Sequence, residues 1–191
     1  MSTQTIRLPT GTVSSDFWTS STGKAPANYY QDVDDPVGTP DDDLSYVSTM
    51  TSPSKVLFSF ENPGIPSSST IHFVRVFLRG YTAVASYLYP HVKVGGNEYT
   101  SGAGLEPENY WGDFTNDWLT NPKTGSPWTV DDVNGIGSNA LEAFGVSATG
   151  FIQRYVTQCY LVIDYTAPAG WYARIAGLTR HVRFARMTPR R

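Results

Sequence analysis

The sequence lacks the features that mark secreted, disulfide-stabilised and membrane-spanning proteins. Its 191 residues contain a single cysteine, Cys159, so no disulfide can form within the chain. The N-terminal residues have no apolar segment of the kind found in signal peptides. No run of apolar residues approaches the length of about 18 that a membrane helix needs. We therefore expect no membrane partner and assembly in a reducing cytoplasm.

Residue patterns for catalysis and cofactor binding are also missing. The histidines His72, His91 and His181 lie far apart, and no phosphate-binding loop, serine nucleophile motif or Cys/His zinc pattern occurs. Acidic pairs such as Glu106 and Glu108 have the chemistry for glycoside hydrolysis, but no pair stands out among the 17 acidic residues. We predict that the protein is not an enzyme and binds no cofactor.

Charge is scarce and unevenly distributed. Charged residues make up 16% of the chain, and every acidic residue lies at or before Asp164. Residues 165–191 hold six arginines and no acid, so an acidic body carries a basic tail. Such a tail could dock on an acidic neighbour, bind nucleic acid or stay disordered. Its arginines are spread out and alternate with apolar residues, which favours protein docking over nucleic acid.

The residues that are abundant predict strands and turns. Aromatic residues make up 14% of the chain, and runs rich in Thr and Val are interrupted by glycine and proline. Residues 71–80 alternate strictly, with Val74, Val76 and Leu78 on one face and Arg75 and Arg79 on the other. This alternation is typical of a half-buried strand.

Residues 155–165 form a second clear strand that is apolar on both faces, which predicts a central position in the fold. Simple alternation places Tyr155 and Cys159 on one face and Val156 on the other. The Gly95-Gly96 pair predicts a tight hairpin turn. A short helix is predicted to begin at Thr129, a capping residue with Asp132 three positions later.

These patterns predict an all-β fold, an antiparallel, jelly-roll-like β-sandwich with one short helix and extended arms at both ends. Residues 1–50 form an N-terminal arm with short strands, residues 51–166 form the sandwich body, and residues 167–191 form a basic C-terminal arm.

Two groups of residues are candidates for ligand contact. Aromatic side chains crowd a loop rich in Gly, Asn and Asp, where they either contact a glycan or plug one end of the sandwich. These residues are Tyr110, Trp111, Phe114 and Trp118. An acidic segment at residues 32–43 offers Asp34, Asp41 and Asp43 as weak candidates for Ca²⁺ binding, although aspartates also simply favour turns. We predict no metal site.

The basic tail supplies the candidates for subunit docking, because aromatic residues and arginine are enriched at protein interfaces. The predicted docking residues are Trp171, Tyr172, Arg174, Arg180, Arg183 and Arg186.

Several segments in order resemble a family of structural proteins from tailed bacteriophages. They are PDDDLSYVST, ENPGIPSSSTIHFVRVFLRG, LTNPKTGSPWTVDDVN, ALEAFGV and YVTQCYLVIDY, within residues 40–166. The resemblance implies a sandwich of jelly-roll or carbohydrate-binding-module type, located in the virion and assembled in the host cytoplasm. The resemblance does not imply a position on the particle. Because the chain has no coiled-coil or repeat stalk of the kind that accompanies a fibre, our first hypothesis is capsid decoration or another head-associated role, with major capsid or tail proteins and copies of itself as partners. The alternative is a tail or fibre module that binds a receptor or a host-surface glycan.

Overall fold

The computed structural model describes residues 2–82, 86–102, 104, 109–150 and 152–169. The strands are β1 (Thr3–Arg7), β2 (Pro9–Asp16), β3 (Thr19–Ser20), β4 (Val47–Thr49), β5 (Ser54–Phe60), β6 (Thr70–Thr82), β7 (Tyr87–Val94), β8 (Asn97–Thr100), β9 (Gly112–Trp118), β10 (Leu141–Thr149) and β11 (Arg154–Thr166). A 3₁₀ helix, η1, spans Pro26–Asp32, and one short α-helix, α1, spans Val130–Val133.

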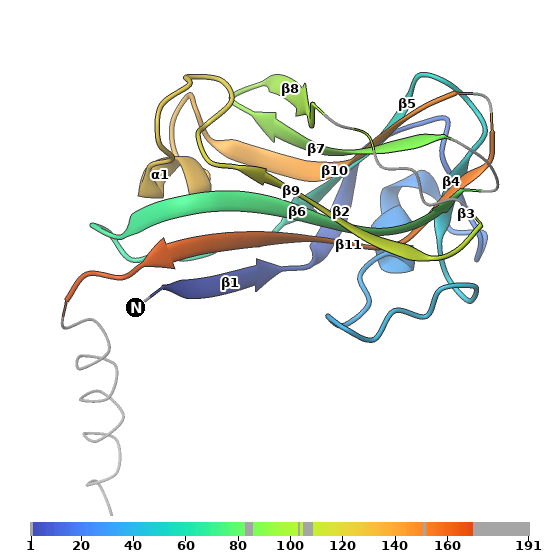
Figure 1. Cartoon of the computed structure of the whole chain (residues 1–191), viewed down its shortest axis with the longest axis horizontal. Coiled ribbons are helices and arrows are strands. Elements are labelled where there is room, and N and C mark those ends of the chain that lie inside the picture. The colour runs from blue at the N-terminus through green and yellow to red at the C-terminus, as the bar shows by residue number, and fades with distance from the viewer. Residues whose placement is uncertain (1, 83–85, 103, 105–108, 151, 170–191) are drawn as a thin grey trace, which may run out of the picture.

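The strands form two antiparallel sheets that lie one above the other (Figure 1). Sheet A has the order β3-β4-β11-β6-β9, with β1 also paired to β11, and sheet B has the order β2-β5-β10-β7-β8. The core between them is built from aliphatic and aromatic side chains of both sheets, including Val76, Leu161, Phe58 and Phe144. The predicted all-β sandwich is confirmed. No helix in the described part of the chain is long and apolar enough to cross a membrane.

The strand pattern of β6 and the local turn signals are confirmed. Val74, Val76 and Leu78 are fully buried, while the side chains between them lie on the outer face of sheet A. The β7–β8 hairpin turns at Gly95 and Gly96, whose φ angles of +53° and +82° suit glycine.

The predicted helix start is also confirmed. The hydroxyl group of Thr129 accepts a hydrogen bond from the Asp132 backbone N–H, and the Asp132 carboxylate accepts one from the Thr129 N–H. This reciprocal pair is a capping box.

Strand β11 is central in its sheet, as predicted. Its side chains, however, do not alternate regularly along the whole strand. A β-bulge shifts the register between Val156 and Gln158 relative to β6. One extra residue in a strand reverses the faces on either side of it. Val156 is therefore buried in the core, and Tyr155 lies on the outer face of sheet A, so the predicted faces of these two residues are wrong.

The N-terminal segment forms short strands that lie at the edges of both sheets. The chain passes directly from β1 in sheet A to β2 in sheet B. Trp18, Tyr29, Val33 and Val47 are buried in the core, and this burial holds residues 3–49 to the sandwich rather than letting them extend as an arm. In Figure 1 the light-blue segment after β3 lies beside β3 and β4 and reaches below sheet A.

Candidate functional site

Four aromatic side chains meet at one end of the outer face of sheet A. Tyr46, Tyr81, Trp111 and Tyr155 form this aromatic cluster, and each is half-buried. The ring of Tyr155 meets Tyr46 edge-on at 5.0 Å between centroids and Tyr81 at 5.5 Å. Trp111 lies 5.8 Å from Tyr81 and 6.4 Å from both Tyr46 and Tyr155. These separations are those of favourable aromatic pairs.

Different segments of the chain bring the cluster together. Tyr81 on β6 and Tyr155 on β11 are direct cross-strand partners. Tyr46 lies just before β4, and Trp111 lies just before β9. Since these strands are neighbours in sheet A, their ends present the four rings at one place on the same face.

The cluster lines an open cavity of about 260 Å³, together with Asp43. The Asp43 carboxylate accepts a hydrogen bond from the indole N–H of Trp111 at 3.1 Å, which fixes the orientation of the ring. Burial, with the nearby Tyr46 and Tyr81 hydroxyls adding to it, raises the pKa of Tyr155, so its hydroxyl group is a proton donor at neutral pH. The cavity thus combines aromatic rings with both donor and acceptor groups.

The acidic loop that supplies Asp43 is anchored on the bulge of β11. The buried Thr157 hydroxyl donates to the Ser45 carbonyl oxygen at 2.9 Å and to the Asp41 carboxylate at 3.2 Å. Asp41 also accepts hydrogen bonds from the backbone N–H and the hydroxyl group of Ser45. The Gln158 amide donates to the carbonyl oxygens of residues 35 and 36. The bulge therefore turns Tyr155 outward and also holds the loop beside it.

The loop aspartates are occupied by contacts within the chain. Asp41 caps its own turn and Asp43 orients Trp111, whereas the backbone of Asp34 pairs with Gln158 in an isolated β-bridge and its carboxylate accepts a hydrogen bond from its own backbone. Burial raises the pKa of Asp34. In the described residues, no group of three or more His, Cys, Asp or Glu side chains is placed to hold a metal ion.

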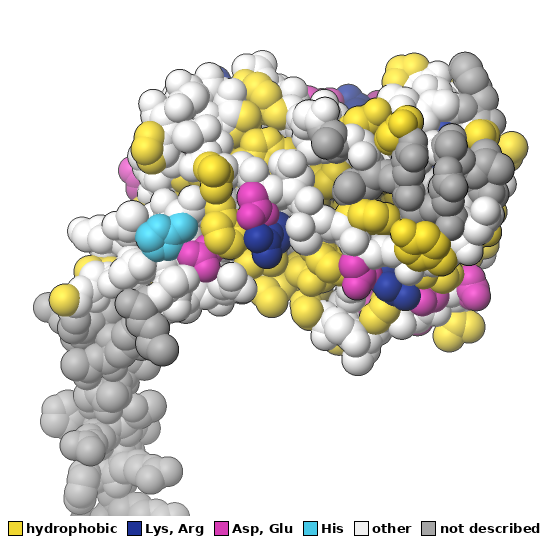
Figure 2. All heavy atoms as spheres, viewed as in Figure 1, with side chains coloured by type: hydrophobic (Ala, Val, Ile, Leu, Met, Phe, Trp, Pro, Cys, Tyr) yellow, Lys and Arg dark blue, Asp and Glu magenta, His cyan; other side chains and the backbone are white. Residues whose placement is uncertain are grey.

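A row of aromatic and charged side chains continues along β6 from the cluster. Phe77 stacks on Tyr160 of β11 with ring centroids 4.3 Å apart, and the guanidinium group of Arg75 lies 4.8 Å from the centre of the Phe73 ring. Tyr81, Phe77 and Phe73 share one face of β6, and we call this set the aromatic row. Figure 2 shows hydrophobic side chains gathered along the lower edge of the molecule, beneath β6 and β11 and beside paired charged groups.

Ion pairs separate the rings of the aromatic row. Arg79 donates to Asp42 at 2.6 and 2.8 Å and to Asp113 at 2.7 Å. Hydrogen bonds to Asp42 are the largest cause of a raised pKa of Arg79. Arg75 forms a two-point contact with Asp117 at 2.5 and 2.7 Å. These pairs give the face fixed polar groups between its aromatic surfaces.

The structure separates the four aromatic residues that the sequence singled out. Trp111 belongs to the aromatic cluster, and Tyr110 beside it is 59% exposed. Phe114 and Trp118 lie on β9, where alternation from Gly112 turns them toward the core, and Trp118 is only 9% exposed. Their rings are therefore unavailable to a ligand on the outer face. The predicted docking residues, from Trp171 to Arg186, lie outside the described residues.

Sequence reasoning did not select Tyr46, Tyr81 or Tyr155 as site residues. Alternation along β6 is a sufficient signal for Tyr81, because it lies two residues after Arg79 on the outer face. Tyr46 gives no such signal, because it comes at the end of a loop whose path is set by contacts with distant residues. Simple alternation places Tyr155 on the wrong face, because it does not reveal the bulge between Val156 and Gln158.

The loop anchor leads to a prediction. Replacing Asp41 with alanine removes three accepted hydrogen bonds, so we expect the free energy of unfolding to fall by about 1–3 kcal/mol. We also expect the NMR signal of the Trp111 indole N–H to shift, since Asp43 would lose its position. The exposed Glu61→Ala variant should change neither quantity. An unchanged indole signal in Asp41→Ala would contradict this role.

No protein-family model and no curated protein matches this sequence. Among solved structures, the chain is similar to the C-terminal CBM6 domain of the laminarinase LamC from Zobellia galactanivorans, with 11% identity over 84% of this chain and 98% of that chain and a TM-score of 0.44. It is also similar to the CBM22-1 xylan-binding domain of Paenibacillus barcinonensis Xyn10C, with 10% identity, coverages of 88% and 95%, and a TM-score of 0.43.

A third similar structure is the Podospora anserina GH26-CBM35 β-(1,4)-mannanase, with 10% identity over 87% of this chain and 28% of that chain and a TM-score of 0.39. All three contain carbohydrate-binding modules. The similarity is limited to the path of the backbone. The sandwich fold of this chain is established by its own two sheets.

Proposed function

We propose that this chain is a non-catalytic module that binds an extended glycan on the outer face of sheet A. The observation that carries the proposal is the aromatic cluster around an open cavity, with Asp43 and three phenol groups at its edge. Sugar rings present apolar C–H faces that pack on aromatic rings, and their hydroxyl groups pair with carboxylates and phenols. A binding site of this type needs large aromatic surfaces and a few fixed polar groups.

The aromatic row supports an extended ligand rather than a single sugar. Tyr81, Phe77 and Phe73 recur at every fourth position of β6, so successive rings lie about 13 Å apart along the strand. Arg79 and Arg75 alternate with them and are fixed by their carboxylate partners. A glycan chain lying along β6 would meet apolar and polar surfaces in turn.

The carboxylates on this face favour binding over catalysis. Glycoside hydrolysis uses two carboxyl groups, one of which must be protonated to assist the leaving group. Asp42 and Asp113 both contact Arg79, and Asp117 contacts Arg75. Asp43 is engaged by the Trp111 indole. Each carboxylate described on this face therefore has a structural partner that holds it in place.

The test is loss of glycan binding in Trp111→Ala. The indole provides the largest aromatic surface of the cluster, so we expect affinity to fall at least about tenfold, or about 1.4 kcal/mol. Affinity electrophoresis through gels containing xylan, mannan, laminarin or bacterial surface polysaccharides measures this loss.

The matched control is Leu119→Ala, which removes an exposed apolar side chain that takes no part in the cluster and should bind as the wild type does. Failure of the wild-type protein to bind any of the glycans, or undiminished binding by Trp111→Ala, would refute the proposal.

A location in a bacteriophage particle is supported by the five ordered sequence segments within residues 40–166. In that setting the module would face a host-surface glycan. Immunogold labelling of intact particles tests it: labelling at the tail tip or on fibres supports a receptor-binding role, uniform labelling of the head supports capsid decoration, and unlabelled particles exclude both.

A further inference from the structure

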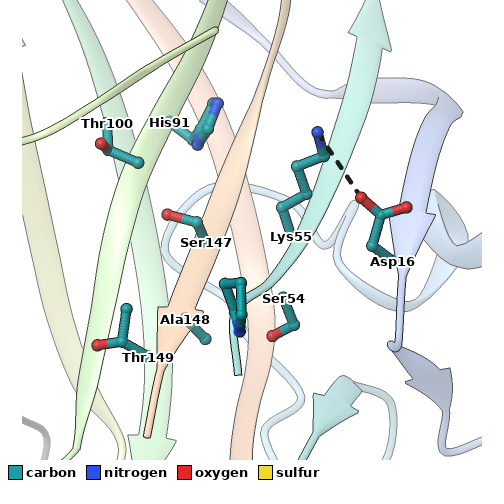
Figure 3. Close-up of a pocket in the computed structure, with 9 residues that line it drawn as sticks. Asp16, Ser54, Lys55, His91, Thr100, Ser147, Ala148 and Thr149 are labelled. Atoms are coloured by element: carbon teal, nitrogen blue, oxygen red, sulfur yellow. Dashed lines mark ion pairs between the residues drawn. The ribbon is translucent and has the colours of Figure 1, made fainter. Parts of the chain in front are cut away.

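A second cavity lies on the opposite side of the molecule, on the outer face of sheet B. Its volume is about 400 Å³. Five strands supply its polar side chains, as Figure 3 shows: Asp16 from β2, Ser54 and Lys55 from β5, His91 from β7, Thr100 from β8, and Ser147 and Thr149 from β10. None of these residues belongs to the aromatic cluster.

This cavity collects buried polar atoms that have no partner. Both imidazole nitrogens of His91 and the hydroxyl oxygen of Ser54 are buried without a hydrogen bond, and both residues are among those that line the cavity. The His91 side chain is only 6% exposed. More than about nine-tenths of buried polar groups in proteins are hydrogen-bonded, so three such atoms around one cavity call for an explanation.

The charges around His91 determine which ligand charge the cavity can accept. Lys55 contacts Glu98 at 2.7 Å and Asp16 at 3.7 Å, and the imidazole of His91 lies 3.6 Å from Glu98. Burial lowers the pKa of His91 to about 4, so the ring is neutral at physiological pH. One ammonium group between two carboxylates leaves no excess positive charge for an anion.

The hydrogen-bonding groups of the site restrict the chemical class of the ligand further. A neutral imidazole donates from one ring nitrogen and accepts at the other, and a serine hydroxyl group does both. Hydroxyl groups on a ligand can donate and accept in the same way, so they can satisfy His91, Ser54 and Ser147 together. An apolar ligand would leave these atoms unpaired.

We infer that the cavity on sheet B is a second binding site, which takes a neutral polyhydroxyl ligand of the size of one sugar. His91 is its central hydrogen-bonding group, and Ser147 and Ser54 complete the contact. Either a free monosaccharide or the end of a glycan chain supplies this chemistry. The inference does not depend on glycan binding by sheet A, because the two sites share no residue.

NMR of the His91 imidazole nitrogens in the full chain provides the test. The protein is titrated with glucose, galactose, mannose, xylose or N-acetylglucosamine, and then with oligosaccharides of the sugar that binds. We expect a saturable shift of both His91 nitrogens. His72 is an internal reference, because it lies in sheet A and contacts Thr166. Tighter binding of the oligosaccharide would identify a chain end as the ligand, and equal binding would identify the free sugar.

Two variants establish that the signal comes from this cavity. His91→Phe keeps a packed ring and breaks no hydrogen bond of the folded protein, so it should fold, yet sugar affinity measured by saturation-transfer NMR should fall at least about tenfold. Ser147→Ala, at a half-buried position, should keep the His91 signal and weaken its titration. Trp111→Ala should leave the titration unchanged.

Several results would overturn the inference. One is the absence of a saturable His91 shift with every sugar. Another is wild-type affinity in both His91→Phe and Ser147→Ala. A loss of the titration in Trp111→Ala would assign the effect to sheet A. A shift produced by inorganic phosphate or by an alkylamine, but by no sugar, would show that the ligand class is wrong.

Discussion

Replacement of Arg154 with alanine is expected to lower the free energy of unfolding by about 3–5 kcal/mol. The Arg154 side chain is fully buried, and no acidic residue of the described chain pairs with it. Its guanidinium group instead donates to the Ser86 hydroxyl at 2.5 Å and to the carbonyl oxygens of Thr51 and Gly150. Alanine removes these donors and leaves a cavity where the long side chain was packed.

Two further variants separate the causes of this loss. Arg154→Met refills most of the cavity but supplies no donor, so the part of the loss that it does not restore measures the hydrogen bonds. Lys93→Ala breaks a partly exposed ion pair with Glu142 and should cost only about 0–1 kcal/mol. Chemical denaturation measures all three. If Arg154→Ala costs no more than Lys93→Ala, the buried arginine does not stabilise the fold.

The sequence predicts features whose causes are local. The alternation of Val74, Val76 and Leu78 marks the inner face of β6 because successive strand residues point in opposite directions. The capping box joins Thr129 to Asp132, and the hairpin turn needs only Gly95 and Gly96. In each case the residues that interact lie within a few positions of one another, so the pattern is visible in the chain.

Features that depend on distant contacts were not predictable. The bulge in β11 is held by hydrogen bonds from Thr157 and Gln158 to a loop more than a hundred residues earlier. It moves Tyr155 to the outer face and so completes the aromatic cluster. The polar composition of residues 1–50 predicted an arm, but a few buried residues, such as Val33 and Val47, join that segment to the sandwich.

The two candidate sites also depend on contacts between distant residues, which the sequence alone does not reveal. The aromatic loop could be recognised from composition, but the start of β9 at Gly112 decides that Phe114 and Trp118 face inward. His91 gave no signal, because neither of the other histidines lies near it in sequence and its neighbours come from other strands. Only the assembled sheet B places Glu98 beside its imidazole and Lys55 beside Glu98.

His91 is expected to make the stability of the protein fall steeply in acid. Its pKa is about 4 in the folded protein, against 6.5 ordinarily, and burial is the main cause. Below pH 6.5 the unfolded chain therefore binds a proton that folded His91 does not. The contribution of His91 to the free energy of unfolding is therefore fully present above pH 6.5 and is lost as the pH falls toward 4. The difference between 6.5 and about 4, at about 1.36 kcal/mol per pKa unit, gives a loss of about 3 kcal/mol.

The His91→Phe variant isolates this contribution. Asp16, Lys55 and Glu98 surround His91 and also carry charges, but they are present in both proteins, so their effects cancel in the difference. Denaturation between pH 7 and pH 4 should show a steeper loss for the wild-type protein than for His91→Phe. Because phenylalanine leaves no unpaired nitrogen in the core of the site, the variant should also be at least as stable at pH 7. Parallel curves for the two proteins would mean that His91 is protonated as readily in the folded chain as in the unfolded one.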